Sequence, residues 1–148
     1  MAKLHQGFFN PKNPIKYRGR YPIAYRSSWE LKMMQILDGR PDVLNWSCES
    51  IIVPYYHPFK RRVARYYPDF TATMKNKEGK ISRWVLEVKP LKETQPPVHG
   101  KRAKQSTKIY SEVLWTINQE KWKAAEKYCQ DNGMKFKLLT EKEIYVYK

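Results

Sequence analysis

The clearest pattern in the chain is an alternation of hydrophobic and polar residues along residues 81–89, ISRWVLEVK. Trp84, Leu86 and Val88 fall on one face, which predicts a β-strand with that face toward a core. Further strands are predicted at 50–56, 65–74 and 134–139. The polar stretch between residues 74 and 81 predicts a turn, so 65–74 and 81–89 should form a hairpin.

Two stretches have the spacing of amphipathic helices, 27–38 and 107–131. Ser27 is a good N-cap, and Glu30 follows three residues later, the spacing of a capping box. A loop is predicted at 91–106, and the tail from residue 141 onward should add one turn or a short strand. This order of elements predicts one α/β domain over 27–148, with a central sheet flanked by helices.

Residues 1–26 show neither the alternation of a strand nor the spacing of a helix, and they are rich in proline, aromatic and basic residues. We therefore expect an extended N-terminal arm. The whole chain carries 29 Lys+Arg against 14 Asp+Glu, a net charge of +15, which favours a polyanionic partner such as nucleic acid. Because the sequence has no long apolar span and no signal peptide, we expect no membrane partner. The two cysteines have no zinc-ligand spacing, and an intracellular setting is expected.

The candidate chemistry lies on the predicted hairpin. Glu87 and Lys89 share the face opposite Trp84, and Asp69 lies on the preceding strand, where pairing could bring it beside Glu87. Two close carboxylates repel each other unless a cation lies between them. Mg²⁺ prefers such oxygen ligands, with Mn²⁺ as an alternative ion, and would activate water and polarise a phosphate. Lys89 would orient the water or stabilise phosphate charge, so the set predicts phosphodiester cleavage.

The spacing Pro68-Asp69 followed by Glu87-Val88-Lys89 resembles the PD-(D/E)XK nuclease superfamily, whose mixed-sheet core has the order αβββαβ. A longer resemblance, over about residues 20–140, is to the head completion nucleases of large contractile-tailed phages and to the TnsA-type transposon endonucleases. It is carried by the runs YRSSWE (25–30), VLNWSCESIIVPY (43–55), RYYPDF (65–70), LEVKP (86–90) and INQEKWKAAEKYC (117–129).

This resemblance implies a catalytic set of Glu30, Asp69, Glu87 and Lys89, in which Asp69, Glu87 and Glu30 bind metal. It also implies an endonuclease that completes the phage head after DNA packaging. Its partners would then be double-stranded DNA and proteins of the head or portal vertex. It would act in the cytoplasm of the infected host or in the virion head.

Basic residues form two clusters that we expect to bind DNA phosphates, and a third in the arm. They are Lys60, Arg61, Arg62 and Arg65; Lys101, Arg102, Lys104 and Lys108; and Lys16, Arg18 and Arg20 of the arm. Lys121 interrupts the apolar stripe of the second helix, and it either extends to solvent or reaches the site. The tryptophans at 84, 115 and 122 are expected in the core rather than as platforms for bases.

Other interpretations remain open from the sequence. Glu30 could serve only the capping box, Asp69 could be a turn residue, and Glu87 with Lys89 could be a surface ion pair. The basic clusters could be solvated loop charge. In place of the endonuclease, the chain could be a non-catalytic head-completion or DNA-clamp protein on a nuclease fold. It could also be a junction-resolvase or restriction-type nuclease.

Overall fold

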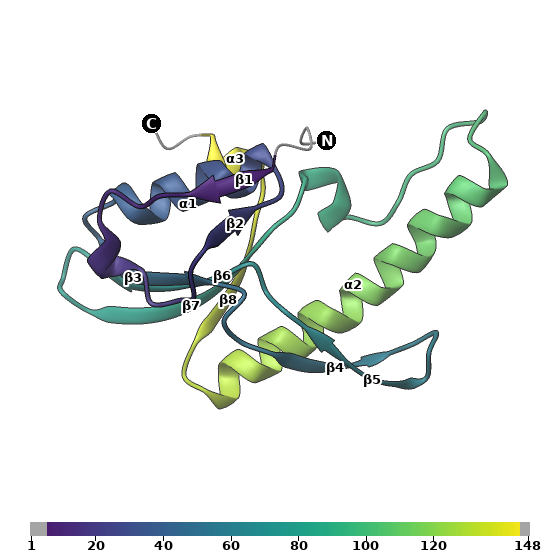
Figure 1. Ribbon diagram of the computed structural model, residues 1–148. Helices are drawn as coiled ribbons and strands as arrows, with labels where there is room; N and C mark the ends of the chain where they lie inside the picture. The colour runs from purple at the N-terminus through teal and green to yellow at the C-terminus, as the bar shows by residue number, and fades with distance from the viewer. Residues whose placement is uncertain (1–5, 146–148) are drawn as a thin grey trace.

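The computed structural model describes residues 6–145, so residues 1–5 of the predicted arm and 146–148 of the predicted tail lie outside it. A four-stranded mixed sheet in the order β3-β6-β7-β8 forms the centre (Figure 1). β3, β6 and β7 are antiparallel, and β8 runs parallel to β7. The strands are β3 Val43–Cys48, β6 Phe70–Lys75, β7 Ile81–Val88 and β8 Lys135–Leu139.

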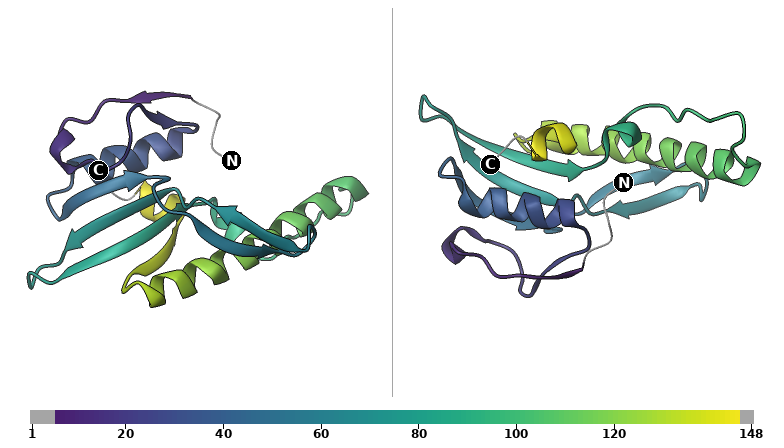
Figure 2. Two further views of the ribbon diagram at one scale, coloured as in Figure 1. Left: turned by 60° about the horizontal axis from the view of Figure 1, so that its bottom comes forward. Right: turned by 90° about the horizontal axis from the view of Figure 1, so that it is seen from above.

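Helices cover both faces of this sheet. α1 (Ser28–Gly39) and the short α3 (Glu141–Ile144) lie on one side, and α2 (Gln105–Asp131) lies on the other (Figures 1 and 2). The Ser27 hydroxyl accepts a hydrogen bond from the Glu30 amide at 3.1 Å and so caps α1. The predicted α/β fold with a central mixed sheet is confirmed. No helix within residues 6–145 has the length and apolar character needed to cross a membrane.

The predicted strand 65–74 was wrong in one respect, because it is two elements. β5 (Arg62–Tyr66) ends before Pro68, β6 begins at Phe70, and the proline has no amide hydrogen with which to continue a ladder. β5 pairs with β4 (Val53–His57) in a small separate sheet, so the predicted strand 50–56 is not part of the central one. This small sheet packs on α2 through a second hydrophobic cluster.

β3 was missed by the sequence analysis. Val43 and Trp46 are both buried although they lie three residues apart, because the register with β6 shifts between Val43 and Asn45. Such a bulge breaks the two-residue alternation on which strand prediction depends.

The N-terminal segment is built into the fold. β1 (Gly7–Phe9) pairs with β2 (Ile23–Tyr25), and a 3-10 turn, η1 (Pro14–Lys16), lies between them. Tyr17 and Ile23 belong to the main core cluster, and the Tyr17 ring lies 4.7 Å from that of Trp46. Strands of three residues are too short to show an alternation, which explains why the sequence gave no sign of them.

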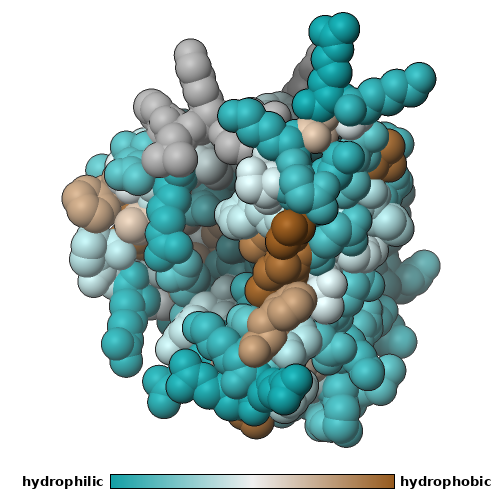
Figure 3. All heavy atoms as spheres, turned by 90° about the vertical axis from the view of Figure 1, so that its right-hand side faces the viewer, coloured by the Kyte–Doolittle hydropathy of each residue, from teal (hydrophilic) through white to brown (hydrophobic). Residues whose placement is uncertain are grey.

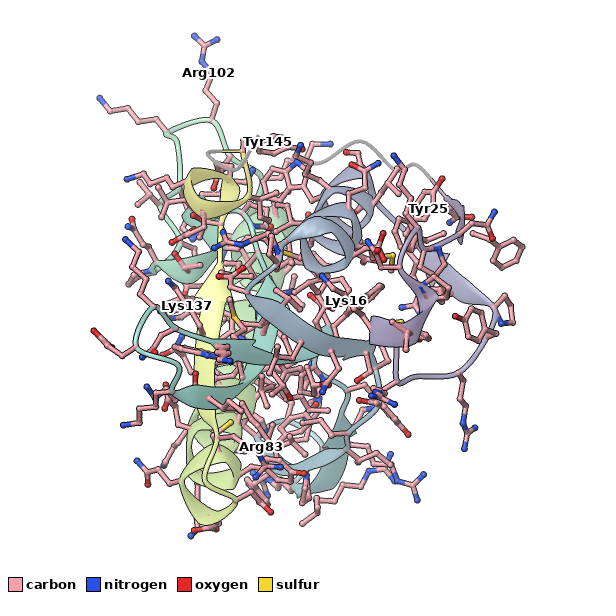
Figure 4. All side chains as sticks on the ribbon, turned by 90° about the vertical axis from the view of Figure 1, so that its left-hand side faces the viewer. Lys16, Tyr25, Arg83, Arg102, Lys137 and Tyr145 are labelled. Carbon is pink, nitrogen blue, oxygen red and sulfur yellow. The ribbon has the colours of Figure 1, made fainter. Side chains whose placement is uncertain are left out.

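One buried carboxylate ties this segment to α1. Asp38 is 3% exposed and accepts hydrogen bonds from the amides of Lys12 at 2.9 Å and Asn13 at 3.0 Å. The Lys16 ammonium donates to the carbonyl oxygens of Asp38 and Arg40 at the end of the helix (Figure 4). Lys16 is therefore a helix-capping group, a role that the sequence analysis did not assign to it.

Replacing Asp38 with alanine should lower the free energy of unfolding by about 1–3 kcal/mol, because two amide hydrogens lose their acceptor. Urea denaturation followed by circular dichroism measures this. The matched control is Asp131→Ala, which removes an exposed ion pair with Lys127 and should change stability by less than about 0.5 kcal/mol. Equal effects of the two substitutions would contradict the anchoring role of Asp38.

Candidate active site

The register between β6 and β7 brings two carboxylates together. Phe70 pairs with Leu86, so the next position places Asp69 across from Glu87. The Asp69 amide donates to Glu87 Oε1 at 3.2 Å, and the Val88 amide donates to Asp69 Oδ2 at 2.8 Å. The two side chains are thus held by the backbone of the opposite strand, and the predicted hairpin between these strands is confirmed.

Both faces of β7 are covered. The face with Trp84, Leu86 and Val88 was predicted to lie toward the core, and the face with Glu87 is buried too. Glu87 is 7% exposed and its neighbour on the same face, Val85, is fully buried. A strand in the middle of a sheet with helices on both sides has two covered faces. The carboxylate pair therefore lies under α2 and the β4–β5 hairpin, not on an open surface.

Burial raises the pKa of both acids, and the charge of Glu87 raises that of Asp69 further. Burial is the main cause of the raised pKa of Asp69, followed by the charge of Glu87, while the Val88 amide opposes the shift. Burial likewise raises the pKa of Glu87, and the Lys89 ammonium partly offsets it. A pair of this kind gains from any cation that replaces the lost solvent.

Two ammonium groups face the pair. Lys89 Nζ lies 3.9 Å from Glu87 Oε2, as the sequence pattern predicted for side chains two residues apart. Lys121 reaches in from α2, with Nζ 5.7 and 5.5 Å from the ring centres of Tyr55 and Tyr66. Burial first, and then the Lys89 charge, lower the pKa of Lys121, while Glu87 and Asp69 oppose this. The question that the sequence left open is settled, because Lys121 lies at the carboxylate pair.

Tyr66 is a site residue whose role sequence reasoning missed. It is 4% exposed, and its hydroxyl has no hydrogen bond of standard geometry to any described residue. The hydroxyl is nevertheless close enough to Glu87 to lower the pKa of that acid. Burial and the Glu87 charge raise the pKa of the Tyr66 phenol itself. The signal was available, because Tyr66 alternates with the exposed Arg65 along β5.

The chain segment that follows Glu87 is fixed by elements from the end of the described chain. The Lys89 amide donates to the Leu139 carbonyl at 2.9 Å, next to the end of β8. The Leu91 amide donates to Glu141 Oε1 at 2.7 Å, at the start of α3. The backbone of Lys89 is therefore positioned by the parallel strand β8 as well as by its own strand.

Glu30 does not join the carboxylate pair directly. Its Oε2 accepts the Arg26 amide at 2.9 Å, just outside the N-terminus of α1, so the local helix-end role is observed. Its charge still raises the pKa of Asp69, and it lines a shallow pocket with Val88 and Lys89. Across residues 6–145, no three or more His, Cys, Asp or Glu side chains are grouped closely enough to hold a metal ion. The convergence of Glu30, Asp69 and Glu87 expected from the sequence is thus not met in this structure.

The chemistry of the remaining donors still fits one hard divalent cation. Asp69 and Glu87 present carboxylate oxygens from adjacent strands, and one or two carboxylates with waters are the usual protein ligands of Mg²⁺. The Tyr66 hydroxyl adds a further oxygen close to Glu87. Burial raises the pKa of both acids, although the Lys89 ammonium lowers both pKa values and the Lys121 ammonium lowers that of Glu87.

The eight predicted DNA-binding residues lie on the β4–β5 hairpin and around the start of α2, at one end of the molecule (Figures 1 and 2). Lys60, Arg61, Arg62 and Arg65 are exposed on the β4–β5 hairpin, whose tip is held by His57 Nδ1 accepting the Phe59 and Lys60 amides. The other four, Lys101, Arg102, Lys104 and Lys108, lie at and before the start of α2, and Lys108 is half-buried. None of the eight has a salt bridge to a described residue.

This end of the molecule also exposes hydrophobic groups. Figure 3 shows them as a strip between hydrophilic side chains. The exposed hydrophobic residues of these elements include Phe59, Val63, Ile109 and Tyr110. A purely electrostatic surface would not have such a strip, so contacts other than phosphate contacts are available there.

Comparison with known proteins identifies the family. The family described as "TnsA-like endonuclease N terminal" matches residues 40–141, which is more than half of the chain. The chain belongs to this family. The matched range includes Asp69, Glu87, Lys89 and Lys121, and Glu30 lies before it.

Two individual relatives were found, and the first agrees with this assignment. A "Head completion nuclease" of Enterobacteria phage T4 is 37% identical over 141 residues, covering 93% of this chain and 91% of that protein. An "Inositol-3-phosphate synthase 1-A" of Xenopus laevis is 26% identical over 129 residues, 73% of this chain but only 20% of that protein. No solved structure matches the chain significantly. The resemblance found in the sequence to a TnsA-like, head completion nuclease family is confirmed.

The raised pKa values of this TnsA-like domain predict a pH-dependent stability. Acids whose pKa is raised on folding stabilise the fold below the ordinary carboxyl pKa of about 4, and this stability is lost as pH rises through the folded pKa. Metal-free Asp69→Asn removes the repulsion, so it should melt higher than wild type at neutral pH, on a scale of about 2–4 °C per kcal/mol. Thermal melts in EDTA from about pH 4 to 8 should show the difference growing with pH.

The control for this series is Asp131→Asn, an exposed acid of α2, which should leave the melting temperature within about 1 °C of wild type at each pH. If Asp69→Asn melted below wild type throughout the range, the carboxylate pair would be stabilising and the repulsion argument would fail.

Proposed function

We propose that this protein is a divalent-metal-dependent DNA endonuclease that hydrolyses phosphodiester bonds. The observation that carries the proposal is the pair of Asp69 and Glu87 on adjacent strands, half-buried at Asp69 and buried at Glu87, with Lys89 beside it. Membership of a TnsA-like endonuclease family supports the same reaction class. Packed apolar residues in place of buried charged groups are often neutral or stabilising, so stability alone does not account for the pair and its two lysines.

Asp69 and Glu87 would hold Mg²⁺, with Mn²⁺ as an alternative ion. When bound, such an ion supplies Lewis-acid stabilisation of phosphate charge and acidifies water. Lys89 and Lys121 would each place an ammonium group beside the phosphate, and burial makes these charges effective because little water screens them. The Tyr66 hydroxyl would hydrogen-bond either Glu87 or a water of the site. Glu30 would act from the pocket's edge by orienting water.

Double-stranded DNA would approach along the end of the molecule that carries the two basic loops. Their side chains form no salt bridge with a described residue, and the chain as a whole has a charge of +15. Each phosphate neutralised releases counterions, so binding should weaken steeply as salt is raised.

The biological setting follows from the relative in phage T4, which is named as a head completion nuclease. We propose the same setting for this chain, with partners among the head or portal-vertex proteins, in the host cytoplasm or in the virion head. A second candidate is a DNA clamp without catalysis. It is favoured by one observation, namely that Glu30 does not join the two strand carboxylates.

Purified protein should nick supercoiled plasmid in Mg²⁺ and lose this activity in EDTA. Asp69→Asn and Glu87→Gln should each reduce nicking by more than about 100-fold while DNA affinity is kept, because each removes one carboxylate charge and little volume. Gel electrophoresis measures nicking, and fluorescence anisotropy measures binding. Asp131→Asn, with its acid exposed on the far part of α2, is the matched control and should cut normally.

The clamp interpretation makes the opposite prediction for wild type. Folded protein that binds DNA but cuts neither duplex, single-stranded nor branched substrates in Mg²⁺ or Mn²⁺ would contradict the endonuclease proposal.

Metal binding can be tested without DNA. Saturating Mg²⁺ should raise the melting temperature of wild type, because an ion that binds only the folded state stabilises it by mass action. The rise should be absent in Asp69→Asn and in Glu87→Gln, and the same concentration of choline chloride serves as the control for ionic strength. An equal rise in wild type and both variants would show that the ion binds elsewhere.

A further inference from the structure

A cleft of about 400 Å³ lies between α2 and the loop that follows β7. It is larger than the other described cavities, of about 160 and 150 Å³. Its lining comes from the loop residues Lys92, Glu93, Gln95–Gly100 and Ala103, and from Thr107, Ser111, Leu114, Trp115 and Asn118 on α2. No function assigned so far uses it.

The cleft adjoins the candidate active site. Glu93 lines the cleft and also the shallow pocket that contains Glu30, Val88 and Lys89. The 3-10 turn Leu91–Thr94 is the wall shared by the two spaces. A strand of DNA with its scissile phosphate at Lys89 would therefore pass its next nucleotides along the cleft.

The lining suits a nucleobase. Pro96, Pro97 and Leu114 provide apolar walls, and Trp115 provides an aromatic ring that is only partly buried. This ring and that of Trp122 pack in a T-shaped arrangement with a centroid distance of 6.2 Å. Trp115 packs against the second hydrophobic cluster, as the sequence predicted, and it also lines the cleft. Asn118 and Thr107 supply the polar groups that a base edge requires.

The charge around the cleft is complementary to a phosphate backbone. The same loop carries Lys92, Lys101, Arg102 and Lys104, and Arg102 projects away from the body of the protein (Figure 4). Two acids are also present, Glu93 in the lining and Glu112 on α2. Glu112 contacts His99, whose Nε2 lies 3.2 Å from Glu112 Oε1, and this contact connects the loop to the helix.

We propose that this cleft binds the base of an unpaired nucleotide, so that the preferred substrate is DNA with a single-stranded tail beside the duplex. The inference rests on the proposed function for the identity of the nucleic acid, and adds the substrate class to it. Stacking on an aromatic side chain is tolerant of sequence, so the preference should not depend strongly on which base is unpaired.

Two leucine substitutions on α2 distinguish an effect of filling the cleft from an effect on the helix itself. Ser111→Leu fills the cleft and removes a hydroxyl that donates to the Lys108 carbonyl. Thr116→Leu adds the same side chain and removes the same kind of bond, from Thr116 to the Glu112 carbonyl, on the exposed face of the helix. Any cost of the lost hydroxyl bond is therefore common to both variants.

Binding is measured by anisotropy in EDTA, with three DNAs that share one duplex: blunt, with a short thymidine tail, and with an abasic tail of equal phosphate number. Wild type and Thr116→Leu should bind the thymidine tail on the order of tenfold more tightly than the abasic tail. Ser111→Leu should bring that ratio close to one. A ratio near one in wild type, or an unchanged ratio in Ser111→Leu, would overturn the proposal.

A second measurement needs no variant. With 2-aminopurine placed at successive tail positions, one position near the duplex should lose fluorescence on binding wild type, because its base stacks on Trp115. Equal emission at every position would also overturn the proposal. Neither measurement requires cleavage, so a loss of plasmid nicking would count against the endonuclease alone, and a loss of tail preference against the cleft alone.

Discussion

The structure depends on one unfavourable contact, the placement of two carboxylates in a desolvated layer between a sheet and a helix. The hairpin register forces Asp69 and Glu87 to face each other, and hydrogen bonds from the opposing backbone hold them there. Three polar groups lie around the two carboxylates. Lys89 comes from the same strand, Lys121 from the covering helix, and the Tyr66 hydroxyl from the accessory hairpin. A fold selected for stability alone would place hydrophobic residues at these positions.

The β4–β5 hairpin and α2 cover the carboxylate pair, and they also form the surface beside it. The β4–β5 hairpin covers Glu87 with Tyr66 and presents the basic tip at its other end. α2 buries Lys121 in its middle, and its first turns carry the second basic cluster and one wall of the cleft. The same hairpin and helix thus contribute to the interior of the site and to the surface beside it.

The sequence carried the parts of the fold that depend on local patterns. Both long helices were predicted within two residues, since capping at Ser27 and a continuous apolar stripe are local signals. The hairpin of β6 and β7 was predicted as well. β3 was not, because a bulge disturbs its alternation, and the β4–β5 sheet was not, because only tertiary contacts separate it from the central one. Within the site, the spacing of Glu87 and Lys89 was readable. The approach of Lys121 across layers was not, nor was the distance that keeps Glu30 apart.

The attachment of Lys89 and Leu91 to Leu139 and Glu141 has a consequence for synthesis of the chain. A ribosome releases the Asp69 and Glu87 strands long before β8 and α3, and until those arrive the backbone after Glu87 has no partner on that side. Nascent chains would therefore carry Asp69 and Glu87 while the backbone of Lys89 still lacks its hydrogen bond to Leu139. Only once translation has passed residue 141 can the segment that carries Lys89 take the position that it has in the complete fold.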